Sequence, residues 1–259
     1  MQPVFGNKNP LKLADDYTDL PLASEILKKS TYVDDLTGGG TTPQELILIK
    51  NQINELLARG GFEARKWASN SPDLLKSLPD SHVMSQTISF DVEEHNTLKI
   101  LGLKWDPVLD VFCYSFTNTN TTCTKRSILS ELARTFDPLG FLTPLTIFIK
   151  ILIQMLWTLG LDWDDKPPEE VITKWTKFKS NLTLLNNLKI DRFINITDST
   201  NYELFGFCDA SERAFCGVVY IRAFFPSINT YKTYLVCGKS KVSPLKTLSL
   251  ARLELCATR

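Results

Sequence analysis

One long apolar stretch limits what this chain can fold into. Residues 141–160, FLTPLTIFIKILIQMLWTLG, are almost continuously hydrophobic, so they must either cross a membrane or lie inside a protein core. Lys150 and Gln154 interrupt the stretch one helical turn apart, and Pro144 after Thr143 is typical of a helix start. These features favour a buried helix over a membrane span, and we expect no membrane partner.

The sequence around this stretch changes from strand-like to helical patterns and back. Residues 125–185 have helical patterns, broken at the DPLG of 137–140. Short runs rich in β-branched and aromatic residues precede and follow this region. The runs are 62–67, 87–90, 98–105, 110–116, 203–211, 214–223 and 233–242. We therefore predict an α+β fold in three parts, 1–117, 118–190 and 191–259.

Two adjacent carboxylates, Asp34 and Asp35, lie between a β-prone segment and a glycine run. Thr42 and Glu45 then predict a helix start with a capping box, so the local order is strand, carboxylate turn, return strand and helix. A solvated acidic turn is the simpler interpretation. However, two like charges at the tip of a packed hairpin repel each other unless a cation neutralises them, and Mg²⁺ prefers such oxygen ligands.

Several motifs together resemble a known family. The segment Tyr32-Val33-Asp34-Asp35 matches the YxDD box of reverse transcriptases, and VFGNKNP of 4–10 resembles the FG element that precedes that box. With LGLKWD, TKRSILSELARTFDPLGFLTPL, GFCDASERAFCGVVYIR and LSLARLELC, these motifs resemble the polyprotein of BEL/Pao-type retrotransposons over nearly the whole chain.

This resemblance implies a role for each part. Residues 1–117 would be the C-terminal part of a reverse transcriptase palm with hairpins, a truncated one. Residues 118–190 would be the helical thumb and connection, and 191–259 the N-terminal part of an incomplete ribonuclease H-like mixed sheet. The activities implied are RNA-directed DNA synthesis and RNA-strand hydrolysis with two Mg²⁺ ions, on a template-primer and an RNA–DNA hybrid.

The resemblance also implies two sets of catalytic metal ligands. Asp34 and Asp35 would hold Mg²⁺ in the polymerase, whereas Asp209, at the end of an apolar strand, and Glu254, on the following helix, would hold it in the ribonuclease. A single Glu on a helix more often faces solvent, and Glu254 becomes a ligand candidate only through its pairing with Asp209.

Further residues are nucleic-acid-binding candidates by the same resemblance. Tyr32 would lie beside the polymerase site, Leu101 and Gly102 would bring backbone close to the primer, and Lys125 and Arg126 would contact phosphates. A strand glycine near a bulge and solvated helix-start cations are the alternatives. Ser211 and Arg213 would be turn and substrate-side residues.

By this resemblance, each of the two active sites has only some of its carboxylates in this chain. We therefore expect a fragment that is inactive alone, in the cytoplasm or nucleus with the other parts of the polyprotein. The alternative is a co-opted nucleic-acid-binding or scaffold protein. A peptidase would need an Asp-Thr-Gly or Asp-Ser-Gly loop, which the sequence lacks. Basic residues outnumber acidic ones only after residue 120, which favours a polyanion contact there.

Overall fold

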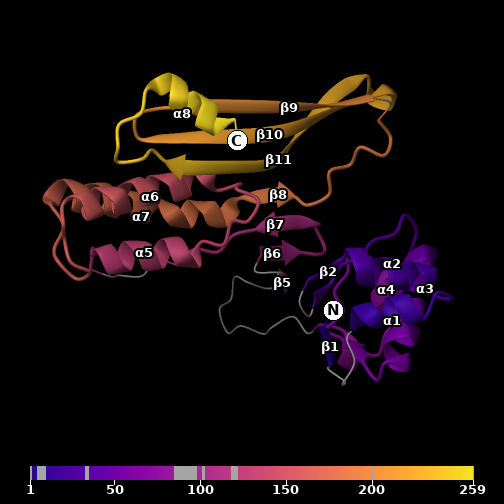
Figure 1. Ribbon diagram of the computed structural model, residues 1–259. Coiled ribbons are helices and arrows are strands. Elements are labelled where there is room, and N and C mark those ends of the chain that lie inside the picture. Colours follow the sequence, from indigo (N-terminus) through magenta and orange to yellow (C-terminus); the bar gives the residue numbers. More distant parts are fainter. Residues whose placement is uncertain are drawn as a thin grey trace. The chain divides into compact units, whose positions relative to one another are not determined.

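The computed structural model describes residues 2–4, 10–32, 35–84, 98–100, 103–117, 122–199 and 201–258. They form two compact units, Met1–Cys113 and Tyr114–Arg259 (Figure 1). Both units mix helices with antiparallel strands, so the α+β prediction is confirmed at this level.

The first unit is a small helical layer with short strand pairs. Its helices are α1 (Pro10–Asp16), α2 (Pro21–Lys29), α3 (Pro43–Arg59), α4 (Pro72–Lys76) and the 3₁₀ turn η1 (Asp80–His82). Its strands pair as β1 (Gln2–Val4) with β4 (Glu63–Arg65), β2 (Thr31–Tyr32) with β3 (Asp35–Leu36), and β5 (Leu98–Ile100) with β6 (Leu103–Asp106) and β7 (Val111–Cys113). The core is formed by apolar residues of α1 to α3, among them the fully buried Leu27, Leu56 and Leu57.

The helix start predicted after the glycine run is α3. Thr42 is its N-cap, and the Thr42 hydroxyl accepts a hydrogen bond from the Glu45 amide at 3.2 Å. The Glu45 carboxylate accepts from the Thr41 amide at 2.7 Å and from the Thr41 hydroxyl at 2.8 Å, so this reciprocal bond falls one residue earlier than in the predicted capping box. The hydrogen bonds from Thr41 lower the pKa of Glu45.

The second unit joins three helices to a long antiparallel sheet. The helices are α5 (Lys125–Arg134), α6 (Thr143–Thr158) and α7 (Glu169–Leu182), followed by the 3₁₀ turn η2 (Thr183–Asn187) and the short strand β8 (Lys189–Asp191). The sheet has the order β11-β10-β9, with β9 (Asn201–Ala210), β10 (Ala214–Phe225), the 3₁₀ turn η3 (Pro226–Ile228) and β11 (Thr230–Val242). Helix α8 (Leu250–Ala257) follows.

The apolar stretch forms the buried helix α6. It buries Ile149, Leu152 and Leu156 against Ile128 of α5 and Trp175 of α7, which confirms the prediction of a core helix. Among the described residues, no helix has both the length and the apolar character that crossing a membrane requires.

The start of α6 packs on the sheet through a turn at Gly140. This glycine has φ of 76°, and a Cβ added there would lie 1.7 Å from the Gly238 carbonyl oxygen of β11. The Gly238 amide donates to the Leu139 carbonyl at 2.8 Å, and further along α6 the Gln154 side chain donates to the Ser243 carbonyl at 2.7 Å. The α6 helix and the turn before it are therefore joined to the sheet by hydrogen bonds from both backbone and side chain.

Candidate active site

Asp209 lies near the end of β9, where it pairs with Cys216 of β10. Its side chain is exposed, and its Oδ1 accepts a hydrogen bond from the Ala210 amide at 2.9 Å. Ser211 forms the turn that follows: its amide and hydroxyl both donate to the Ala214 carbonyl, at 2.8 and 3.0 Å. The strand and its turn thus hold the Asp209 backbone in place while the carboxylate remains open to solvent.

Glu254 lies on α8, which packs across β9 and β10. A Cβ at Gly217 of β10 would meet the Ala257 carbonyl of α8 at 2.9 Å, and Gly217 pairs with Cys208, the neighbour of Asp209. Glu254 is half-buried and precedes Ala257 by one helical turn. The two elements that carry the candidate carboxylates are therefore in contact at one end of the sheet.

Side chains alternate along a strand, so Asp209 lies on the face of the sheet opposite to Cys208 and Gly217, and α8 packs on the Gly217 face. The structure therefore brings the two elements together, but it places Asp209 and α8 on opposite faces of the sheet. The described residues contain no group of three or more His, Cys, Asp or Glu side chains that could hold a metal ion. Carboxylate oxygens are the ligands that Mg²⁺ prefers. Neither Asp209 nor Glu254 is paired with a cation among the described residues, so both carboxylates are available to a metal ion.

The polymerase-type candidates lie in the first unit. Asp35 begins β3 and pairs with Tyr32 of β2, whose side chain is 67% exposed. The hairpin predicted around the carboxylates is thus present, with Asp35 on its return strand. Asp34, Leu101 and Gly102 lie outside the described residues. The roles of all five residues stay predictions.

Lys125 is enclosed rather than presented to solvent. Only 3% of the residue is exposed; its ammonium donates to the Leu161 carbonyl and lies 4.1 Å from the centre of the Trp157 ring. Arg126 is exposed, but its Nε and Nη2 each donate to one oxygen of Asp164 at 2.8 Å. This pairing lowers the pKa of Asp164. Arg126 can therefore reach a phosphate only by leaving Asp164. Lys125 instead fixes the start of α5 against the Trp157 ring and the Leu161 carbonyl.

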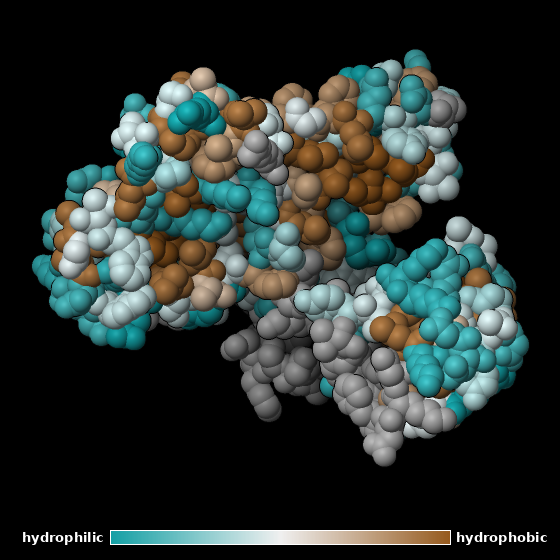
Figure 2. Space-filling view, in the orientation of Figure 1, coloured by the Kyte–Doolittle hydropathy of each residue, from teal (hydrophilic) through white to brown (hydrophobic). Residues whose placement is uncertain are grey.

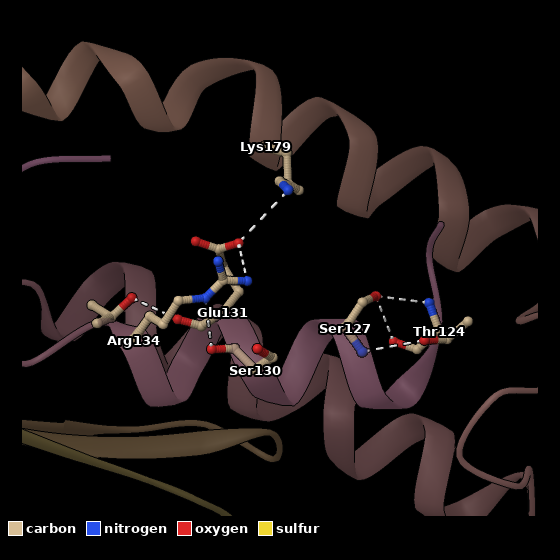
Figure 3. A network of polar contacts seen from close by, with 7 residues as sticks. Thr124, Ser127, Ser130, Glu131, Arg134 and Lys179 are labelled. Atoms are coloured by element: carbon tan, nitrogen blue, oxygen red, sulfur yellow. Dashed lines mark hydrogen bonds and ion pairs between the residues drawn. The ribbon is translucent and has the colours of Figure 1, made fainter. Parts of the chain in front are cut away.

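The sequence patterns did not indicate a buried charge cluster between α5 and α7. Glu131 of α5 lies 3.6 Å from the Lys179 ammonium of α7 and 3.7 Å from the Arg134 guanidinium (Figure 3). The side chains of Glu131 and Lys179 are each 9% exposed. A signal was present, because Lys179 follows Trp175 by four residues on the apolar side of its helix.

Comparison with protein families matches the second unit. The model that describes the Pao retrotransposon-like RNaseH-like domain matches residues 124–259, from the N-cap of α5 through the sheet to α8. A comparison with curated proteins finds none that is significantly similar to the chain. The match covers more than half of the chain, and the mixed helices and antiparallel sheet agree with such a domain. The chain therefore belongs to the Pao retrotransposon-like family, whose RNaseH-like domain it carries.

Proposed function

We propose that the second unit contributes to RNA-strand hydrolysis in RNA–DNA hybrids, as part of a retrotransposon polyprotein. The observation that carries the proposal is the placement of Asp209 at the end of a sheet strand, with Glu254 on a helix packed against that strand, inside the region that matches the family. Asp209 and Glu254 would hold Mg²⁺, which when bound activates water and stabilises the leaving oxygen.

The chain's own residues support this role in two ways. The ladder between β9 and β10 and the Ser211 turn fix the backbone that carries Asp209. Leu253, which is 2% exposed, anchors α8 beside Glu254. Both carboxylates thus come from elements with fixed backbones. A shared Mg²⁺ would further require the Glu254 side chain to reach past the edge strand β9 to the face of Asp209.

For the first unit we propose the palm end of an RNA-directed DNA polymerase. Asp34 and Asp35 would be its Mg²⁺ ligands in nucleotidyl transfer, and Tyr32, Leu101 and Gly102 would lie along the template-primer. The support is the β2–β3 hairpin with Asp35 on its return strand, followed by α3. The three parts would be 1–117, 118–190 and 191–259, and the other partners would be the remaining parts of the polyprotein, in the cytoplasm or nucleus.

Hydrolysis of the RNA strand in a labelled RNA–DNA hybrid, by the polyprotein with Mg²⁺, tests the ribonuclease role. Asp209→Asn and Glu254→Gln should each abolish cleavage, because a metal ligand is lost. Glu212→Gln is the matched control: this exposed glutamate lies three residues after Asp209 and should be dispensable. Cleavage by Asp209→Asn at the wild-type rate would refute the role and favour a co-opted, non-catalytic protein.

A further inference from the structure

One face of the sheet carries a continuous group of aromatic rings. Tyr220 and Phe224 lie four residues apart on β10, where Tyr220 pairs with Phe205 and Phe224 pairs with Tyr231. Because side chains alternate between the two faces of a strand, these four rings lie on the same face. We call this set the aromatic face. It consists of Phe205, Phe207, Tyr220, Arg222, Phe224 and Tyr231. Figure 2 shows apolar surface over the strands of this sheet.

The rings are linked by direct contacts and by one cation. Phe207 meets Tyr220 edge to face, with ring centres 6.0 Å apart, and the ring centres of Phe224 and Tyr231 are 5.0 Å apart. The Arg222 guanidinium lies 4.4 Å from the Tyr231 ring and 5.1 Å from the Phe205 ring, and Phe205 pairs with Tyr220 across the ladder. The aromatic face is therefore a continuous surface of rings around a guanidinium.

This face is open to solvent. Phe207 is 58% exposed and Tyr231 56% exposed, and neither belongs to a core cluster of the described residues. Rings held on paired strands lose little further conformational freedom when a partner binds. Contiguous exposed apolar surface of this kind is typical of interaction sites.

The chemistry of the face favours nucleic acid. Aromatic rings and guanidinium planes stack on unpaired bases, and sheet-borne rings commonly stack two or three of them. Tyr231 pairs with Phe224 and Phe207 pairs with Val218, six residues earlier on β10, which corresponds to about 20 Å along the strands. The segment 201–242 carries five basic and three acidic side chains, which suits a polyanion.

A dry interface with a second copy of the chain is less favourable. Arg222 and Glu203 form an ion pair of 3.0 Å at the middle of the face, with side chains 40% and 50% exposed. Covering both charges with apolar surface would remove their water, whereas interfaces with nucleic acid keep water and charge.

We propose that the aromatic face binds single-stranded nucleic acid by stacking bases on Phe207 and Tyr231. Asp209 follows Phe207 by two residues and lies on the same face of β9, so a strand held on the rings is led toward the proposed cleavage residue. The direction toward cleavage rests on the proposed function; the stacking itself does not.

Fluorescence anisotropy of a labelled twelve-nucleotide oligouridine with the full chain in EDTA tests the proposal. Phe207→Leu and Tyr231→Leu should each weaken binding at least about fivefold, since they remove a stacking ring but keep apolar bulk. This ratio should persist when salt is raised, because stacking releases no counterions. Tyr202→Leu is the matched control: Tyr202 is also 58% exposed on β9, but it pairs with Ala223 and faces the other side.

Three results would overturn the inference. The first is equal weakening by Tyr202→Leu and Phe207→Leu, and the second is no weakening by either ring variant. The third is a dimeric molar mass in light scattering that Phe207→Leu returns to the monomer, which would make the face an interface between copies. Because binding is measured without metal, the stacking proposal can fail while Asp209-dependent cleavage is observed, and the reverse can also occur. The two proposals are therefore tested separately.

Discussion

Replacing Gly140 by alanine should uncouple α6 from the sheet. The change has two costs. Gly140 has φ of 76°, a backbone conformation that costs an L-residue about 1 to 2 kcal/mol. In addition, the new Cβ would lie 1.7 Å from the Gly238 carbonyl oxygen, and a clash with backbone cannot be relieved by turning a side chain.

The second cost can be isolated with a matched glycine. Gly160, beyond the end of α6, has φ of 66°, but a Cβ there would meet nothing within 4 Å. Gly160→Ala therefore carries the conformational cost alone. Gly140→Ala must also separate the Leu139 turn from β11, which breaks a backbone hydrogen bond and the packing around it, so we expect at least about 2 kcal/mol beyond the Gly160→Ala cost.

Urea unfolding followed by tryptophan fluorescence measures both variants, since Trp157 and Trp175 lie in helices of this unit and Trp163 lies in the connection between them. Hydrogen exchange gives a local readout, because the Gly238 amide should lose its protection in Gly140→Ala. Equal destabilisation by the two substitutions, with the Gly238 amide still protected, would refute the packing of this turn on β11.

Three further predictions concern charged groups. Lys179→Met should lower the free energy of unfolding by about 2 kcal/mol, because it removes one of the two cations beside the buried Glu131 carboxylate and leaves the Arg134 guanidinium at 3.7 Å; a urea-measured loss like that of an exposed lysine would contradict this. Asp164→Asn should free Arg126 and strengthen oligonucleotide binding at low salt, while Arg126→Gln in that background should lower the salt slope by about one and abolish the gain. Burial raises the pKa of Asp137, so its contribution to stability is full below its ordinary pKa of 3.8 and is lost as pH rises through the raised value; Asp137→Asn should therefore gain stability relative to wild type from pH 4 to pH 7 in urea titrations, and a constant difference would contradict this.

The elements with strong local patterns were predictable from sequence. The α6 helix follows from its apolar stretch and Pro144, and the long strands follow from their β-branched and aromatic residues. The YxDD box marked a hairpin, and β2 and β3 form one. In each case the signal lies within a few residues, so no distant contact was needed to find the element.

Features that depend on distant residues were not predictable. The resemblance to a thumb implied a phosphate contact for Lys125, and the alternative was a solvated cation at a helix start. Neither showed that Trp157 and the Leu161 carbonyl, more than thirty residues away, enclose it. The close approach of Gly140 to Gly238 likewise has no local signature. The alternation of Phe205 and Phe207 was visible in the sequence, but only the strand pairing shows which rings they join.

The most direct test of the account compares two activities of the polyprotein in one preparation. Primer extension and RNA-strand cleavage are measured with Mg²⁺ for wild type, Asp34→Asn and Asp209→Asn. The account predicts that Asp209→Asn loses cleavage and keeps primer extension, whereas Asp34→Asn does the reverse, because each carboxylate serves its own metal site. Undiminished RNA-strand cleavage by Asp209→Asn would contradict it.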